Sequence, residues 1–224
     1  MKKFVYLARK FLSKYDLLDT AGRRAYITFQ TTIFRLRFFN STINQNKFIF
    51  ECFSGRSISD SPYSIYLMLT KLRPDAEYIW VTNIEARAEH RSILGDSVKL
   101  VDYRSNEYFK EYSQSAYWIS NCRIPLSIHK NKDQTYVQTW HGTPLKKLGC
   151  DIGFSSTNAS SKVGNDLVYV NEGRRVDFFI SPSRYASNCF KTAFKINSSA
   201  ILETGYPRND ILVTHSCNRD YITR

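Results

Sequence analysis

"KFIFECF", residues 47–53, is the stretch of sequence that decides the fold. After its first lysine, every position except Glu51 is apolar. Such uninterrupted runs of aromatic and β-branched residues are typical of strands that are buried on both faces of a sheet. Similar segments follow at 77–83, 98–103, 116–122, 135–140, 177–183 and 200–207. We therefore predict seven strands.

Helical patterns separate these strands. They are expected at 62–72, 85–94, 105–115, 143–149, 160–175 and 184–194, with Pro62 and Ser183 as helix-start residues. The polar, glycine-containing segment 153–166 is predicted to be a mobile loop that runs into a helix. Alternating strands and helices predict an α/β fold: a Rossmann-like parallel sheet with helices on both faces.

The composition narrows the function classes. A chain of 224 residues with 42% hydrophobic and 23% charged residues is typical of a globular protein and argues against disorder. Its net charge of +12 predicts attraction to polyanions, such as nucleic acid, an anionic membrane or phosphorylated substrates. The five cysteines are scattered and lack zinc-site spacing, which favours reduced thiols. No signal peptide and no transmembrane helix are predicted.

The N-terminal segment 1–42 is strongly basic. Residues 1–40 hold nine Lys/Arg against Asp16 and Asp19, which gives +7. A helical apolar stripe is formed by Phe4, Leu7, Ala8, Phe11, Leu12, Tyr15 and Leu18. We predict an amphipathic helix on an anionic membrane surface. A helix packed on its own domain is the alternative, whereas no recognised motif supports nucleic-acid binding.

"QTWHGTPLKKLGCD", residues 138–151, combines charge with turn residues at the end of a predicted strand. Gly142 permits close approach of a ligand to the backbone, and Thr143 is suited to cap a helix over 143–149. The free N–H groups of that helix would bind an anion. Lys146 and Lys147 would add full positive charges to this phosphate site.

His141 is the candidate catalytic residue. It follows the strand 135–140, and ligands of open α/β sheets bind beyond the carboxyl ends of the strands. Its imidazole could accept a proton from an attacking hydroxyl group. The alternative is a structural histidine bonded to a neighbouring carbonyl group, with solvated lysines beside it. Cys150 is predicted to be a small buried thiol and not a nucleophile.

The block "WHGTPLKKLGCD" resembles the signature of the CDP-glycerol glycerophosphotransferase family, the bacterial teichoic acid primases and polymerases. Segments 49–66, 117–121 and 205–212 agree in the same order. The resemblance implies a GT-B-type transferase whose N-terminal domain takes the acceptor and whose second domain holds CDP-glycerol. It also implies peripheral attachment to the cytoplasmic face of the bacterial membrane and a lipid-linked polyol-phosphate acceptor.

The resemblance implies roles for particular residues. His141 would deprotonate the acceptor hydroxyl group, which attacks the donor's β-phosphorus and releases CMP. From charge and turn chemistry, and not from the resemblance, phosphate contacts are expected from Gly142, Thr143, Lys146 and Lys147. Cleft-lining positions without a chemical role are expected for Glu51, Ser54, Gly55, Asp60 and Arg208. No cofactor and no protein-held metal ion are expected. Whether a divalent ion accompanies the phosphate groups of the donor is left undecided by the sequence.

The predicted organisation has three parts: the basic segment 1–42, the Rossmann-like acceptor-side domain 43–212, and the start of an interdomain linker at 213–224. The donor-binding half is expected to lie outside this sequence or on a separate chain, so that this chain alone has little turnover. Alternatives are a relative that uses another CDP-polyol such as CDP-ribitol or makes capsule, and a non-catalytic module that docks to polyanions or membranes.

Overall fold

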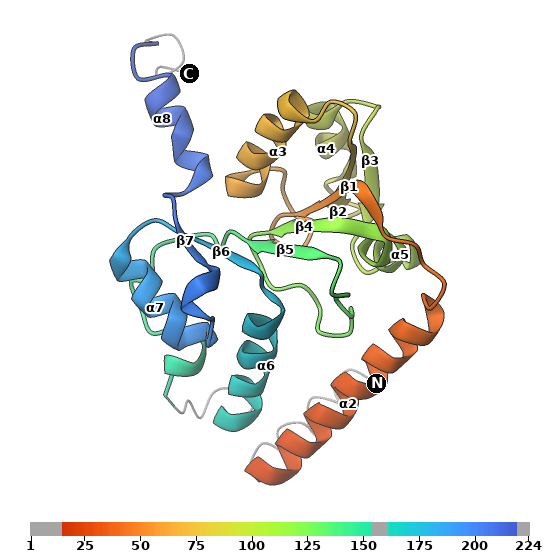
Figure 1. The fold of residues 1–224 in the computed structure, drawn as a ribbon, viewed down its shortest axis with the longest axis vertical. Helices are drawn as coiled ribbons and strands as arrows, with labels where there is room; N and C mark the ends of the chain where they lie inside the picture. The colour runs from red at the N-terminus through yellow and green to blue at the C-terminus, as the bar shows by residue number, and fades with distance from the viewer. Residues whose placement is uncertain (1–14, 154–160, 219–224) are drawn as a thin grey trace.

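The computed structural model describes residues 15–153 and 161–218. Its centre is a seven-stranded sheet with all neighbouring strands parallel, in the order β3-β2-β1-β4-β5-β6-β7 (Figure 1). The strands are β1 (Asn44–Glu51), β2 (Glu77–Thr82), β3 (Lys99–Asp102), β4 (Ser115–Ser120), β5 (Thr135–Gln138), β6 (Phe178–Ser181) and β7 (Ile201–Glu203). The seven predicted strands are confirmed.

The helices cover both faces of this sheet. They are α2 (Asp16–Arg37), α3 (Asp60–Leu72), α4 (Arg87–Leu94), α5 (Asn106–Gln114), α6 (Lys162–Arg175), α7 (Arg184–Phe194) and α8 (Asp210–Thr214), with 3₁₀ turns η1 (Gly149–Asp151), η2 (Ser198–Ala200) and η3 (Pro207–Asn209). Ser183 caps α7 as predicted, because its side chain accepts a hydrogen bond from the Ala186 N–H. Helix α3 begins two residues before the predicted Pro62.

Alternate side chains of the strands build two separate cores. Ile49, Trp118 and Tyr136 point to one face, where α2, α5 and α7 add their buried aromatic residues. Phe50 and Trp80 point to the opposite face, which α3 and α4 cover. Each strand therefore needs apolar residues at successive positions, which explains the uninterrupted runs in the sequence.

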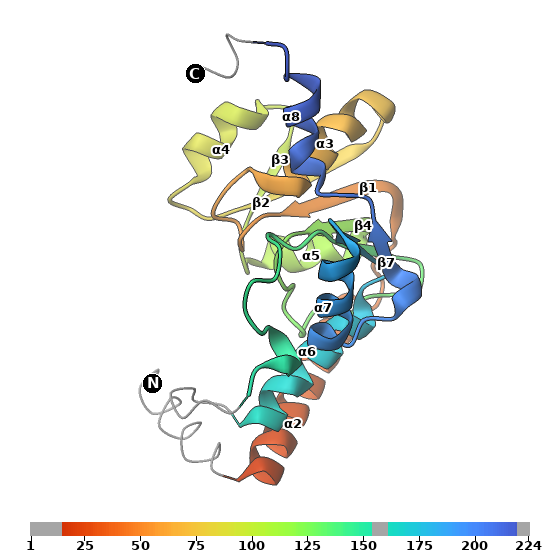
Figure 2. The same cartoon turned by 90° about the vertical axis from the view of Figure 1, so that its left-hand side faces the viewer.

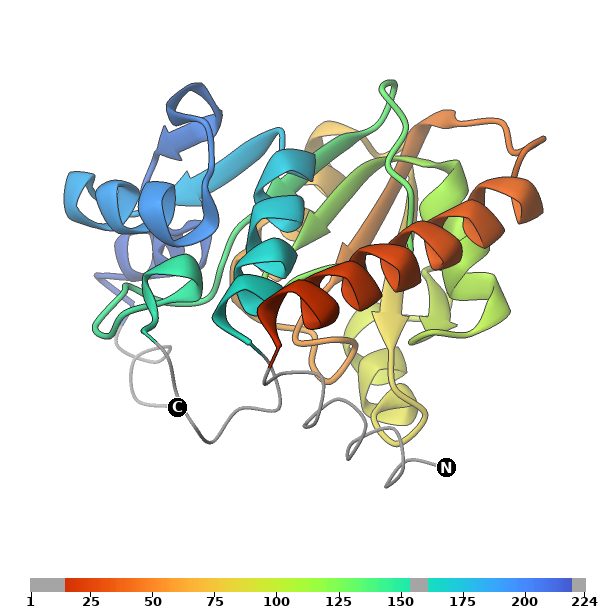
Figure 3. The same cartoon turned by 90° about the horizontal axis from the view of Figure 1, so that it is seen from below.

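Helix α2 packs obliquely across one side of the sheet, next to α6 (Figure 3). Phe34 is buried in the core, and the buried carboxylate of Asp19 accepts hydrogen bonds from the N–H and Oγ of Ser161, the N-cap of α6. Gly164 is required at this contact, since a Cβ there would lie 2.2 Å from Asp19 Oδ2. The helix therefore belongs to the folded body along its inner face.

The predicted stripe of apolar residues mostly falls on residues 1–14, outside the described residues. Half of the predicted loop 153–166 also lies outside them, and its last five residues belong to α6. The last members of the stripe, Tyr15 and Leu18, are exposed on the described part of the chain. Figure 2 shows α8 beside α3 at one end of the molecule and α2 at the opposite end. Within the described residues, no helix is long and apolar enough to cross a membrane.

Candidate active site

The strand order reverses between β1 and β4, which are neighbours in the sheet although two strands separate them in the sequence. Ligands of open α/β sheets bind at such a switch point, beyond the carboxyl ends of the strands. The loops that follow β1, β4 and β5 meet there. The Phe53 N–H donates a hydrogen bond to Asn121 Oδ1 at 2.9 Å, which ties the first two loops together.

His141 lies on the third of these loops. Its Nδ1 is 2.9 Å from the carbonyl oxygen of Asn121. A carbonyl oxygen only accepts hydrogen bonds, so Nδ1 carries the proton and Nε2 keeps its lone pair. The rings of Trp140 and Phe53 pack at centroid distances of 4.2 and 5.7 Å and hold the imidazole from two sides. The exposed His141 is thus oriented as a proton acceptor.

A polar chain fixes the backbone around this histidine. Asn121 Nδ2 donates to Asp60 Oδ2 at 2.6 Å, and Arg208 Nη1 donates to Asp60 Oδ1 at 2.7 Å. The same Arg208 nitrogen reaches the carbonyl oxygen of His141 at 3.0 Å. Two residues predicted to line a cleft, Asp60 and Arg208, therefore come together 148 positions apart in the sequence. They position the histidine loop and do not face the cavity described below.

Backbone strain accumulates at this edge of the sheet. Phe53, Ser54, Asp60, Arg104 and Trp140 all have a left-handed backbone, with φ between 46° and 61°. Each follows the carboxyl end of a strand or begins the helix after it. Non-glycine residues in this conformation cost of order 1 kcal/mol or more and cluster at functional sites. The strain supports the same location for the active site.

Ser54 and Gly55 form the tight turn after β1. Gly55 has a φ of 79°, and a Cβ there would lie 2.9 Å from the Thr82 carbonyl carbon. Only glycine fits this close contact with the end of β2. Ser54 lines the cavity, whereas Gly55 shapes the turn beneath it.

The predicted helix over 143–149 is wrong. Residues 142–148 form an irregular loop, and only the turn η1 follows. Leu145 is 90% exposed, so the segment buries no apolar face that could stabilise a short helix. Instead Gly149 has a φ of 50°, and a Cβ there would lie 2.2 Å from the Ala193 carbonyl oxygen of α7. The anion site predicted at the start of that helix is therefore absent from the described structure.

The side chains assigned to phosphate binding lie on this loop. Thr143, Lys146 and Lys147 are exposed, and Gly142 has no heavy atom within 4 Å of an added Cβ. Tyr185 of α7 donates a hydrogen bond to the Pro144 carbonyl oxygen at 3.1 Å and fixes the loop near its middle. The two lysines follow His141 closely but do not line its cavity.

Glu51, a predicted cleft-lining residue, is instead fully buried. Its carboxyl group accepts hydrogen bonds from the hydroxyl groups of Tyr112 at 2.7 Å and Tyr108 at 3.0 Å. Burial raises the pKa of Glu51 to about 7, although the two tyrosines and Cys122 act in the opposite direction. Glu51 therefore joins the end of β1 to α5 and has no surface in the cavity.

A cavity of about 930 Å³ opens at this edge of the sheet. Helix α2 forms one wall and residues 122–127 of the β4–β5 loop form another. His141, Trp140 and Ser54 line it from the strand ends, together with Arg104 after β3. Its size is in the usual range for a ligand site.

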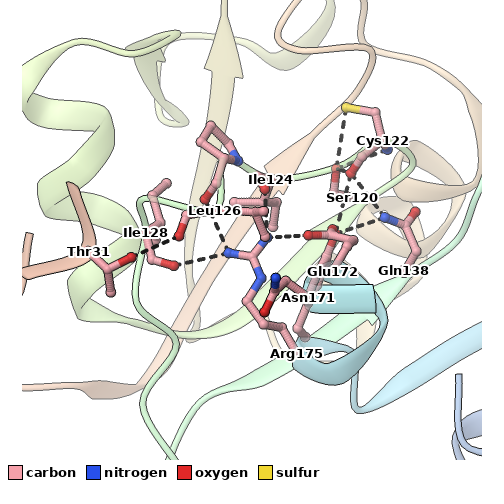
Figure 4. Close-up of polar contacts among 12 residues, drawn as sticks. Thr31, Ser120, Cys122, Ile124, Leu126, Ile128, Gln138, Asn171, Glu172 and Arg175 are labelled. Atoms are coloured by element: carbon pink, nitrogen blue, oxygen red, sulfur yellow. Dashed lines mark hydrogen bonds and ion pairs between the residues drawn. The ribbon is translucent and has the colours of Figure 1, made fainter. Parts of the chain in front are cut away.

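The β4–β5 loop is held rigidly between α2 and α6 (Figure 4). The Arg175 guanidinium donates to the carbonyl oxygens of Ile124, Pro125 and Ile128 at 2.6 to 3.1 Å and pairs with Glu172. From the other side, Thr31 Oγ1 of α2 donates to the carbonyl oxygen of Leu126 at 3.2 Å. One cavity wall and the carbonyl group that orients His141 thus belong to a loop with fixed hydrogen-bond partners.

The cysteines near the site are not nucleophiles. Burial and the neighbouring Glu51 raise the pKa of Cys122 to about 11, so its side chain is a neutral thiol near pH 7. Cys150 is buried as predicted, and burial raises its pKa as well.

Sequence reasoning missed three residues of this site. Asn121, Arg104 and Arg123 each follow a strand, which is the signal that could have found them. Asn121 lies within the family-like segment 117–121, and the two arginines contribute to the net positive charge.

The sheet order and the cavity at the switch point define a Rossmann-like α/β domain with a ligand-binding edge. The solved wall teichoic acid polymerase TagF superimposes with a TM-score of 0.78 and 32% sequence identity, over 93% of this chain and 51% of that one. This similarity confirms the predicted fold class.

The chain belongs to the CDP-glycerol:poly(glycerophosphate) glycerophosphotransferase family, whose model matches residues 32–223. It is 38% identical to the teichoic acid poly(glycerol phosphate) polymerase of Staphylococcus epidermidis over 78% of this chain and 24% of that protein. It is 36% identical to the teichoic acid glycerol-phosphate transferase of Staphylococcus aureus, over 80% of this chain and 45% of that protein. The chain thus spans less than half the length of these relatives.

Proposed function

We propose that this chain forms the acceptor-side half of an enzyme that transfers glycerol phosphate from CDP-glycerol to a membrane-linked poly(glycerol phosphate) acceptor in teichoic acid synthesis. Family membership and the activities of the named relatives support the reaction class. The observation that carries the proposal is the bond between His141 Nδ1 and the Asn121 carbonyl oxygen. It leaves Nε2 as the proton acceptor on an exposed residue that lines the cavity.

In the proposed reaction, His141 Nε2 takes the proton of the acceptor's terminal hydroxyl group. The hydroxyl oxygen forms a bond to the β-phosphorus of CDP-glycerol, and the bond from that phosphorus to the bridging oxygen breaks. CMP leaves with the bridging oxygen and its electron pair. The imidazolium is stabilised by its Nδ1–H bond to Asn121, since a cationic donor strengthens that bond. The reaction as proposed uses no protein-held metal ion.

We place the donor site in a second domain, on the same or a separate chain, because the solved relative is about twice as long as the matched region. Lys146 and Lys147 then have a specific role in this proposal. They are exposed on the loop after His141, so they are free to contact phosphate groups of a donor held opposite them.

Helix α2 supports the proposal that the protein is peripheral on the cytoplasmic face of the bacterial membrane. At about 100° per residue, Leu18, Phe29 and Leu36 fall on the side opposite the buried Phe34. All three are exposed, Phe29 by 61% and Leu36 by 73%. The helix therefore packs on its own domain with one face and presents an apolar face outward, with basic residues on its flanks (Arg24, Arg35 and Arg37).

The test is CMP release by the protein in the length that its own cell produces. One reaction contains CDP-glycerol and a lipid-linked glycerol phosphate acceptor, and a second contains CDP-glycerol without acceptor. In a third reaction, CDP-ribitol replaces CDP-glycerol in the presence of the acceptor. The proposal predicts CMP only when acceptor is present, and faster with CDP-glycerol. Absence of CMP in the complete reaction would contradict a transferase, and preference for CDP-ribitol would contradict the donor.

A further inference from the structure

The cavity beside α2 has a surplus of positive charge. Its charged lining consists of Arg23, Arg104 and Arg123 against Asp19. Arg23 Nε lies 2.9 Å from Asp19 Oδ1, so these two form an ion pair. Within the described residues, no carboxylate pairs with Arg104 or Arg123. Two guanidinium groups are therefore available for an anionic ligand.

Aromatic rings hold both guanidinium groups in place. Arg123 lies over the ring of Tyr169 at 4.6 Å, and Arg104 over the ring of Tyr103 at 5.2 Å. Such stacking fixes the plane of a guanidinium group while its N–H edge stays free to donate. The backbone of Arg104 is also held in the left-handed region, at a φ of 61°. The backbone at Arg104 is therefore strained at the position where its guanidinium group lines the cavity.

Part of the remaining lining is apolar, beside polar residues such as Gln30, Ser54 and Ser127. Tyr26 and Ile27 contribute from α2, and Ile124, Pro125 and Leu126 contribute from the β4–β5 loop. A free inorganic phosphate or a bare polyol phosphate would leave these walls without a partner. A ligand that carries both a phosphate group and a hydrocarbon segment matches the two kinds of wall.

The same cavity joins the membrane-facing helix to the candidate base. α2 turns its exposed apolar face outward, the neighbouring side of the helix with Gly22 and Tyr26 lines this cavity, and His141 lines the cavity from the strand ends. A ligand that emerges from the membrane beside α2 would meet the arginines within the same cavity as the imidazole.

We infer that this cavity binds the lipid-linked acceptor while its glycerol phosphate chain is still short, so that Arg104 and Arg123 contact its phosphate groups, the α2 wall contacts the start of its hydrocarbon chain and its terminal hydroxyl group reaches His141. The inference rests on the proposed function, because it names the binding site of the proposed acceptor. It assigns to α2 a substrate-binding role in addition to membrane attachment.

The test measures binding to the complete chain in solution, without donor. The probe is a fluorescently labelled short glycerol phosphate oligomer joined through a phosphodiester to an octyl chain. The same oligomer without the alkyl chain, and inorganic phosphate, serve as competitors. Arg104→Gln and Arg123→Gln remove the proposed ligands. Arg174→Gln removes an exposed arginine of α6 that does not line the cavity and is the charge-matched control.

Each cavity variant is expected to weaken probe binding about tenfold, because a charge-assisted contact to phosphate is lost. Arg174→Gln should stay within about twofold of the parent protein, as expected for a site outside the cavity. The alkyl-free oligomer and inorganic phosphate should compete poorly. Unchanged binding in both cavity variants, or equal competition by the alkyl-free oligomer, would overturn the inference.

A steric variant tests the same site without changing charge. Gly22→Phe adds a ring at a cavity-lining position of α2 where an added Cβ meets no atom within 4 Å. Thr28→Phe adds the same ring at an exposed position of α2 outside the cavity. Weaker binding in Gly22→Phe alone supports the site, and equal binding in both variants contradicts it.

His141→Ala separates this inference from the proposed function. The variant should bind the probe like the parent protein while CMP release is lost. Tight probe binding combined with undiminished CMP release in His141→Ala would leave the binding site standing and remove the base. CMP release by the parent protein without any probe binding would support the proposed function and contradict the acceptor-binding site.

Discussion

The Nδ1 of His141 lies 2.9 Å from the carbonyl oxygen of Asn121, the first residue after the neighbouring strand β4. The contact depends on the adjacency of β4 and β5, since it joins the ends of two paired strands. It converts an otherwise ambiguous imidazole into one defined tautomer.

We expect His141 to carry its neutral-state proton on Nδ1, because its partner is a carbonyl oxygen. Nitrogen NMR of ring-labelled histidine, assigned by comparison with His141→Gln, distinguishes the two tautomers. Free imidazole side chains favour the Nε2–H form in water, so finding that form at His141 would contradict the geometry.

Asp19→Ala should destabilise the protein by about 2 kcal/mol, because two hydrogen bonds from Ser161 and the ion pair with Arg23 are lost. Denaturant unfolding measures the loss, and hydrogen exchange should show faster opening of α2. Asp16→Ala, at an exposed position of the same helix, is the control and should have little effect.

The Asp19 contact also predicts acid sensitivity. Burial alone would raise the pKa of Asp19, but hydrogen bonds from Ser161 and the Arg23 charge outweigh it and lower the pKa below the usual 3.8. The folded state therefore binds fewer protons than the unfolded state in this range. The stability that Asp19 contributes is present above pH 3.8 and is lost as the pH falls through the lower folded value. A pH profile of the Asp19→Ala difference that stays flat under acid would contradict this.

Glu51→Gln should become increasingly favourable relative to the parent protein as the pH rises. The pKa of Glu51 is raised from 4.5 to about 7, so the folded state holds a proton that the unfolded state has released. As the pH rises from 4.5 to about 7, the parent protein's free energy of unfolding therefore decreases. This group accounts for about 3 kcal/mol of the decrease. The amide of the variant has no such proton to lose. Unfolding curves at about pH 5 and about pH 8 measure the difference, with the exposed Glu85→Gln as control.

The double change Phe29→Ser and Leu36→Ser should weaken sedimentation with anionic vesicles by about tenfold or more, because two apolar side chains no longer enter the interface. Both positions are exposed, so stability should change little. Leu72→Ser, at a position of α3 that is 67% exposed, is the matched control. Equal sedimentation of all three proteins would contradict an interfacial role for the outward face of α2. Deletion of the helix would be a poorer test, because Phe34 belongs to the core.

The sequence predicts the sheet well because each strand is buried on both faces and must be apolar throughout. It predicts the position of His141 because strand ends mark the ligand edge. It fails over 143–149, where good capping residues are present but no buried face supports a helix. It also fails for Glu51, a carboxyl group whose tyrosine partners come from α5, far along the chain.

The cavity itself was beyond prediction from the pattern. Its walls bring together α2, the β4–β5 loop and the ends of three strands, and no local spacing in the sequence encodes these contacts. Arg104 and Arg123 look like ordinary surface charges until the ring of a tyrosine is seen beneath each one.

The most direct test of the central claim is the rate of CMP release from CDP-glycerol by His141→Ala in the complete enzyme, with acceptor affinity measured in parallel. Removal of a general base predicts a fall of about a hundredfold or more in the rate, with acceptor affinity unchanged. His215→Ala, on the turn after α8, should retain the parent rate. A His141→Ala rate within about threefold of the parent enzyme would contradict the assignment of His141 as the base.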